Sequence, residues 1–188
     1  YVHIPFCERL CWFCGCHTRA VNRPDPVRRY VGLLRSEIAL TASRLPARLA
    51  AQRLHLGGGT PNMTSVEDLH TLFSALRGAF DLLPAAEISA ELDPVSLTRE
   101  WVQAAADQGL NRASLGVQDL SPEVQAAVNR REGFDVLRRA VDWLREAGVR
   151  GLNFDLMYGL PRQTTRHVTE TVDRVLTLRP DRLALFGY

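Results

Sequence analysis

Strand-like and helix-like segments alternate along the whole of this chain, and the alternation limits the folds open to it. The strand-like segments are short and apolar, and each is followed by a segment whose apolar residues recur three and four positions apart. The expected strands are residues 1–6, 53–56, 87–92, 112–117, 152–158 and 182–188. Strict alternation predicts a parallel sheet with helices outside it, and both an open doubly wound sheet and a barrel satisfy this pattern.

Local signals place helices between these strands. Pro26 suits the first turn of a helix that begins at Asp25. Ser65 and Asp68 resemble a capping box at the start of the next helix. The other expected helices are residues 98–108, 121–129, 134–147 and 164–178, and Gly109 is expected to end the first of these as a left-handed cap.

The cysteines lie together in one short stretch near the start, as Cys7, Cys11, Cys14 and Cys16. The first three have the spacing C-x3-C-x2-C. A disulfide framework would scatter its cysteines, so this cluster indicates a metal centre. Zinc usually takes two separated pairs of ligands, and His3 or His17 would have to complete such a site. A [4Fe–4S] cluster uses one thiolate per iron, and three cysteines would leave one iron open.

Polar residues fall at the ends of the expected strands, where parallel α/β sheets bind their ligands. Because unpaired buried polar groups are costly, several of them at one edge of a sheet suggest a bound ligand. In chain order these residues are Gly57 to Thr60, Glu91, Asp93, Gln118, Asp119 and Asp155.

Each of these signals also has an ordinary structural interpretation. The triple glycine could be a flexible turn, and Glu91 a solvated acid on the polar face of its strand. Gln118 and Asp155 could be satisfied polar groups of the core, and Arg130 a charge that complements a helix C-terminus. A phosphate-binding loop is disfavoured because no Lys-Ser/Thr pair follows the glycines.

The cysteine loop, with Phe13 before its third cysteine, resembles the radical S-adenosylmethionine (SAM) superfamily. The longer string YVHIPFCERLCWFCGCHT and the segments EISAELDP, GVQD, VNR and NFDLMYGLP resemble the oxygen-independent coproporphyrinogen III oxidase family. The resemblance implies an α/β fold, a partial (β/α)6 barrel with parallel strands inside and helices outside. Six strands cannot close a barrel as eight do, so we expect a lateral opening. We expect residues 1–188 to be a single core domain that lacks N-terminal and C-terminal extensions.

The resemblance also implies the roles of individual residues. Cys7, Cys11 and Cys14 would bind three irons of a [4Fe–4S] cluster, and SAM would chelate the fourth. Cys16 would then be a structural thiol that binds no iron. Two SAM molecules are expected, lined by Tyr1, Phe13, Gly58, Gly59, Thr60, Glu91, Gln118, Arg130 and Asp155.

The activity implied by the resemblance is oxidative decarboxylation in haem biosynthesis. Two propionates of coproporphyrinogen III would become vinyl groups, which gives protoporphyrinogen IX. One alternative is a haem-trafficking chaperone on the same scaffold, but Cys16 argues against it because such relatives usually lack this cysteine. A second alternative is a small zinc-binding interaction module, in which the glycine segment would have no role.

Composition and charge narrow the expected partners. A net charge of +2 is too small to indicate nucleic-acid binding, and no apolar run is long enough to span a membrane. Arg19, Arg23, Arg28 and Arg29 could attract carboxylates, although a solvated helix start is the simpler interpretation. Clustered reduced cysteines fit the cytoplasm. We expect a monomer with a tetrapyrrole substrate and an electron donor that reduces the cluster.

Overall fold

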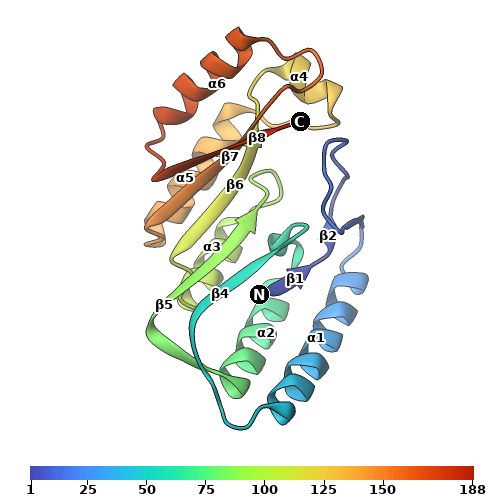
Figure 1. The fold of residues 1–188 in the computed structure, drawn as a ribbon, viewed down its shortest axis with the longest axis vertical. Helices are drawn as coiled ribbons and strands as arrows, with labels where there is room; N and C mark the ends of the chain where they lie inside the picture. The colour runs from blue at the N-terminus through green and yellow to red at the C-terminus, as the bar shows by residue number, and fades with distance from the viewer.

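The structure, a computed structural model, describes residues 1–188 and contains a six-stranded sheet in the order β1-β4-β5-β6-β7-β8. Every neighbouring pair of strands is parallel. The strands β1 and β8 lie at opposite edges, so the sheet is open (Figure 1). The predicted fold class is therefore confirmed. The strands are β1 Val2–Ile4, β4 Ala50–Gly58, β5 Asp81–Leu92, β6 Arg112–Gln118, β7 Gly151–Tyr158 and β8 Arg182–Gly187.

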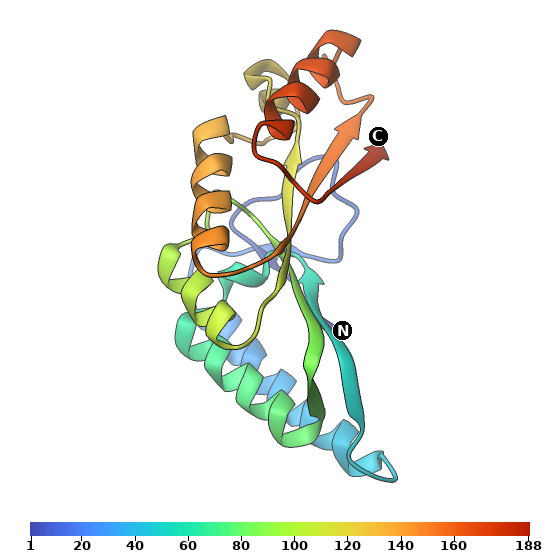
Figure 2. The same ribbon diagram turned by 90° about the vertical axis from the view of Figure 1, so that its left-hand side faces the viewer.

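Helices connect consecutive strands, and α1, α2, α3 and α5 lie on one face of the sheet (Figure 2). Because helices cover only that face, burial alternates along the central strands. In β6, Ala113, Leu115 and Val117 are buried, whereas the residues between them are only partly covered. The opposite face is therefore free to carry polar side chains. The helices are α1 Asp25–Arg44, α2 Val66–Ala79, α3 Arg99–Asp107, α4 Pro122–Ala127, α5 Phe134–Glu146 and α6 Thr165–Leu176.

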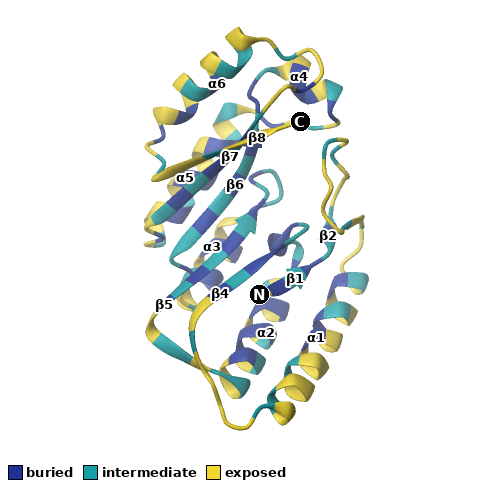
Figure 3. Ribbon diagram, in the orientation of Figure 1, coloured by how far each residue is buried: buried dark blue, intermediate teal, exposed yellow.

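One apolar core of 36 buried residues fills the space between the sheet and the helices (Figure 3). Leu115 and Phe154 from the sheet and Leu72 and Leu137 from the helices are almost completely buried in it. This layer fixes the strands rigidly, and it leaves their carboxyl ends and polar face available for a site.

The first predicted strand is interrupted. Pro5 has no backbone N–H to donate, and the strand divides there into β1 and a two-residue strand, β2 Phe6–Cys7. The strand β2 pairs in parallel with β3 Arg19–Ala20, which was not predicted. This short pair is a separate two-stranded sheet that joins the two ends of the cysteine loop to each other.

Most helix signals hold, with one difference at α2. Gly109 has a φ of +94° and ends α3 as predicted. Ser65 caps α2 by accepting a hydrogen bond from the backbone N–H of Asp68. The Asp68 carboxylate accepts from the Ser65 hydroxyl instead of the Ser65 backbone, because its side chain is one carbon shorter than that of glutamate. Only half of the predicted capping box is therefore present.

None of the helices combines the length and the apolar character needed to cross a membrane.

Candidate functional site

A cavity of about 440 Å³ lies between the cysteine loop and the carboxyl ends of β4, β5, β6 and β7. Of the strand-end residues, Gly57 and the buried Asp119 do not line it. Every residue expected to bind the cluster or SAM, except Tyr1, does. These residues are Cys7, Cys11, Phe13, Cys14, Gly58, Gly59, Thr60, Glu91, Gln118, Arg130 and Asp155. Residues far apart in the sequence thus meet at one edge of the sheet, as parallel topology requires.

The cysteines are free thiols on this cavity. The Cys7 sulfur accepts a hydrogen bond from the Thr60 hydroxyl at 3.4 Å and lies 3.2 Å from the Thr18 hydroxyl. No three His, Cys, Asp or Glu side chains stand close enough together to hold a metal ion as they are arranged. The donor set nevertheless suits iron–sulfur ligation, because the thiols are unpaired and come from one loop.

Burial raises the pKa of two thiols of the loop. The pKa of Cys16 rises to about 11 with a contribution from Cys14, and the pKa of Cys11 rises although Arg130 opposes the shift. Both ring nitrogens of His3 are already used: Nε2 donates to the carbonyl of His17 at 2.9 Å, and Nδ1 accepts from the Tyr1 hydroxyl at 3.0 Å. His3 therefore has no free lone pair to offer a zinc ion.

Each of the three consecutive glycines is needed for a different structural reason. A Cβ on Gly57 would lie 2.9 Å from a Glu91 carboxylate oxygen and 3.0 Å from the His55 ring. Gly58 has a φ of +107°, which side chains rarely tolerate. A Cβ on Gly59 would lie 2.6–2.7 Å from backbone atoms of Phe6. The segment is therefore a constrained close approach of backbone, and the flexible-turn interpretation is wrong.

Glu91 at the end of β5 is held from two sides. Its Oε2 accepts a hydrogen bond from the Gly58 backbone N–H at 3.0 Å, and its Oε1 lies 3.3 Å from His55 Nε2. The hydrogen bond from His55 lowers the pKa of Glu91 below its ordinary value, and the Gly58 N–H adds to this effect against the opposing effect of burial. The carboxylate therefore stays ionised where it faces the cavity.

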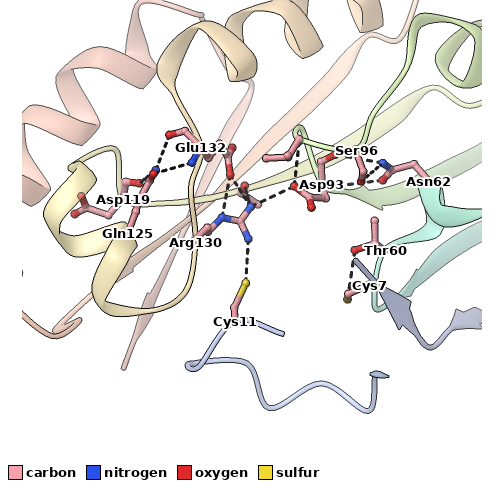
Figure 4. Close-up of polar contacts among 12 residues, drawn as sticks. Cys7, Cys11, Thr60, Asn62, Asp93, Ser96, Asp119, Gln125, Arg130 and Glu132 are labelled. Carbon is pink, nitrogen blue, oxygen red and sulfur yellow. Dashed lines mark hydrogen bonds and ion pairs between the residues drawn. The ribbon is translucent and has the colours of Figure 1, made fainter. Parts of the chain in front are cut away.

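Arg130 connects the cysteine loop to the sheet (Figure 4). Its guanidinium lies 2.7 Å from the Glu132 carboxylate and 3.7 Å from that of Asp93, and it donates to the Cys11 sulfur at 3.6 Å. It also donates to the carbonyl of Gly116 in β6. Burial opposes its charge, but the two carboxylates outweigh burial and raise the pKa of Arg130. Arg130 therefore does not complement a helix C-terminus, because its charge is paired with Glu132 and Asp93 inside the site.

Glu132 is fully buried beside Arg130, and Gln125 of α4 clamps its backbone. Gln125 donates to the Glu132 carbonyl and accepts from its N–H, both at 2.8 Å (Figure 4). The Oε1 of Glu132 has no hydrogen-bond partner. Burial raises the pKa of Glu132 to about 7 although Arg130 opposes the shift, and the Asp93 charge adds to it.

This raised pKa predicts a pH-dependent stability. Because the folded chain binds the Glu132 proton more tightly than the unfolded chain, the contribution of Glu132 to stability is fully present below pH 4.5 and is lost as the pH rises through about 7. Compared with Glu132→Gln, the wild type should lose at most about 3 kcal/mol of unfolding free energy across this range. Urea denaturation of both proteins at several pH values measures the difference. A difference that does not change with pH would show that Glu132 keeps an ordinary pKa.

Asp155 in β7 combines both of the roles considered for it. Its carboxylate accepts from the Ser114 hydroxyl at 2.6 Å and from the Asn153 amide at 2.7 Å, so it has partners, yet it faces the cavity. Burial raises the pKa of Asp155, and these two hydrogen bonds oppose the shift. Gln118 ends β6 with a φ of 65°, which turns the chain toward the cavity wall.

Tyr1 lies outside the cavity lining. It is 73% exposed, and its ring stacks on His55 with centroids 5.7 Å apart. Several lining residues were not predicted as site residues. Arg9 and Thr18 lie within the cysteine-loop string but had no role assigned, and Arg131 and Phe186 belong to no motif. In the sequence, Ala113, Leu115 and Val117 alternate with Ser114, Gly116 and Gln118, and this alternation is the signal that could have identified Ser114 and Gly116.

The chain is similar to several known proteins. A family model described as the radical SAM superfamily matches residues 1–175. The oxygen-independent coproporphyrinogen III oxidase of Bradyrhizobium diazoefficiens is 50% identical over 188 residues, which are 100% of this chain and 42% of that protein. The coproporphyrinogen III oxidase, anaerobic 1, of Cereibacter sphaeroides is 46% identical over 100% of this chain and 42% of its own length. The chain thus spans less than half the length of these curated relatives.

Solved structures agree in fold. The Escherichia coli coproporphyrinogen III oxidase, described as a radical SAM enzyme, matches with a TM-score of 0.95 and 39% identity over 100% of this chain and 43% of that chain. Native anSMEcpe with bound AdoMet matches with a TM-score of 0.69 and 14% identity over 99% of this chain and 50% of its own. At that identity the second likeness concerns the fold alone.

Proposed function

Because the chain belongs to the radical SAM superfamily, we propose that it is the SAM-binding core of an oxygen-independent coproporphyrinogen III oxidase. The observation that carries this proposal is the meeting of the cysteine loop with the glycine segment, Glu91, Gln118, Arg130 and Asp155 around one cavity. The substrate assignment comes from the relatives, which are named as coproporphyrinogen III oxidases.

Membership of the superfamily implies a [4Fe–4S] cluster and SAM. We propose that Cys7, Cys11 and Cys14 hold the cluster, since their thiols face the cavity and are unpaired. Held by these three thiols and reduced, the cluster would supply the electron for reductive cleavage of SAM, and SAM would supply the hydrogen-abstracting group for oxidative decarboxylation of the propionates. Cys16 lies outside the C-x3-C-x2-C spacing, and we propose that it binds no iron.

The chain's own residues bind and orient SAM. Ionised carboxylates such as Glu91 accept hydrogen bonds from ammonium and hydroxyl groups, and the Arg130 guanidinium suits a carboxylate. Glycine backbone at Gly58 and Gly59 lets the ligand approach closely. The polar residues fall into one group on β4 and β5 and a second group on β6, β7 and the loop of Arg130. This division supports two SAM molecules.

The cavity wall also suits a large apolar ring that bears carboxylates. Leu10, Met157 and Phe186 supply apolar surface, and Arg9 and Arg131 supply positive charge. The reaction further needs an external electron donor and an acceptor. We expect the protein to act as a monomer in the cytoplasm, where thiols such as these remain reduced.

An anaerobic assay tests the proposal. The protein with reconstituted cluster is given coproporphyrinogen III, SAM and dithionite, and the products are followed by mass spectrometry. We expect loss of CO2 from two propionates and formation of protoporphyrinogen IX. A protein that cleaves SAM and binds haem but leaves both propionates intact would be the chaperone, and the proposed activity would be rejected.

A further inference from the structure

We propose that His55 is a positioning residue that orients the Glu91 carboxylate for SAM, and this inference rests on the function proposed above. His55 lies on β4 and is not part of the cavity lining, whereas Glu91 on β5 is. His55 does not line the cavity itself and would therefore act through Glu91.

The parallel register brings the two side chains together. His55 pairs with Ser89 in the β4–β5 ladder, so Glu91 lies two residues further along the same face of β5. His55 Nδ1 is 2.8 Å from the Ser89 hydroxyl, and Nε2 is 3.3 Å from Glu91 Oε1. The imidazole thus spans the residues at both positions, and the Ser89 contact fixes the rotation of its ring.

The hydrogen bonds of His55 indicate which of its ring nitrogens carries the hydrogen. An ionised carboxylate only accepts, so His55 Nε2 must carry the hydrogen that it donates to Glu91. In the neutral ring Nδ1 then accepts from the Ser89 hydroxyl at 2.8 Å, a closer partner for its single hydrogen than the Leu54 carbonyl at 3.4 Å. Both Glu91 oxygens are occupied from the sheet side, one by His55 and one by the Gly58 N–H. Their remaining lone pairs are left for a ligand in the cavity.

Two neighbours hold this pair in place. A Cβ at Gly57 would lie 2.9 Å from Glu91 Oε2 and 3.0 Å from His55 Nε2, so the missing side chain makes room for their contact. The Tyr1 ring stacks on His55 at an interplanar angle of 21°. Tyr1 thereby supports the site through its contact with His55, without lining the cavity itself.

Orientation, more than Coulomb attraction, is the contribution expected from His55. The side chains of His55 and Glu91 are 38% and 44% exposed, and an ion pair so exposed is strongly screened. A carboxylate held in one rotamer still binds a ligand better than a mobile one, because it loses less conformational entropy on binding. His55 should consequently affect SAM binding and leave the chemical step unchanged.

Kinetics of the cluster-loaded enzyme test this role. In His55→Ala we expect the KM for SAM to rise about tenfold and kcat to stay within about twofold, because one hydrogen bond to a charged group is lost. His55→Gln, which can still donate to Glu91, should recover most of the affinity. Gly57→Ala should raise the KM in the same way by displacing Glu91 while leaving His55 in the chain. The control is His70→Gln, whose ring contacts Gln108 away from the cavity and which should change neither parameter.

A double-mutant cycle separates positioning from general stability. If His55 acts through Glu91, then His55→Ala should have no further effect on the KM for SAM in a Glu91→Gln background. Full additivity of the two substitutions would overturn the inference. An equal fall of kcat in His55→Ala and His55→Gln, with the KM unchanged, would overturn it as well.

A readout without SAM distinguishes failure of this inference from failure of the proposed function. In nitrogen-15 NMR of the cluster-loaded protein we expect His55 to carry its proton on Nε2, with a resonance that shifts in Glu91→Gln. A His55 resonance insensitive to Glu91 would reject the inference even if SAM is cleaved. A wild type that shows this coupling but cleaves no SAM would reject the proposed function and leave the His55–Glu91 contact established.

Discussion

Replacement of Cys7 by alanine is expected to abolish cluster assembly and to lower the rate of SAM cleavage at least 100-fold. Cys7 ends the short strand β2, and its sulfur contacts the hydroxyls of Thr18 and Thr60. Two hydroxyl groups thus support this sulfur, as expected of an iron ligand. Loss of groups that merely support a metal ligand already costs 10–100-fold, and loss of the ligand itself should exceed that. Iron and sulfide content and 5′-deoxyadenosine formation measure the effect.

The fourth cysteine provides the matched control. Cys16→Ala removes a thiol from the same loop, but Cys16 lies outside the C-x3-C-x2-C spacing that supplies the proposed ligands. We expect this variant to keep its iron, whereas Cys11→Ala and Cys14→Ala should behave like Cys7→Ala. Loss of iron in Cys16→Ala, with Cys7→Ala unaffected, would contradict the assignment of ligands.

Gly59→Ala should be the most damaging substitution in the glycine segment. Its Cβ would meet the backbone oxygen and nitrogen of Phe6 at 2.6 and 2.7 Å and the Thr18 hydroxyl at 2.5 Å. Backbone atoms cannot move aside as a flexible side chain can, and the Phe6 side chain is fully buried. Because Cys7 follows Phe6, any adjustment also displaces a proposed iron ligand. We expect about 1–3 kcal/mol of lost stability and a large loss of bound iron.

Denaturation by urea and iron content together measure this effect, and circular dichroism shows whether the variant is folded. The matched control is Gly32→Ala in α1, where a Cβ would meet no atom within 4 Å. This change should stabilise the protein by about 0.5–1 kcal/mol, since alanine favours a helix more than glycine does. A Gly59→Ala protein as stable and as rich in iron as the wild type would show that the segment tolerates a side chain.

The architecture could be predicted from the sequence because local and global signals agree. Strands and helices alternate strictly, and parallel topology then brings the carboxyl ends of all strands to one edge. Cys7, Gly59, Glu91 and Asp155 were therefore expected to lie near one another, and they line a single cavity. Caps such as Gly109 could be predicted because their backbone geometry depends on only a few residues.

Features that depend on tertiary packing could not be predicted. The strand β3 has two residues and carries no periodic signal, so its pairing with β2 depends on the path of the cysteine loop. The clamp of Gln125 on Glu132 joins α4 to the following loop, and neither residue belongs to a motif. Tyr1 remains a predicted SAM contact that lies outside the cavity lining, and its contacts with His3 and His55 carry no signal in the sequence.

The proposed role of His55 could be predicted only in part. A histidine directly before a glycine segment has no specific meaning in a single sequence. Once the register pairs it with Ser89, however, its proximity to Glu91 follows from the period of a strand. Strand register thus supplies what the residue pattern lacks.

The most direct test of the account is the fate of SAM when the reconstituted protein is reduced. We expect the reconstituted protein to be brown, to hold about four irons per chain and to convert SAM to methionine and 5′-deoxyadenosine in equal amounts. We expect Cys7→Ala to lose this reaction. A colourless protein that binds one zinc ion and leaves SAM intact would contradict the account and support the zinc-binding module.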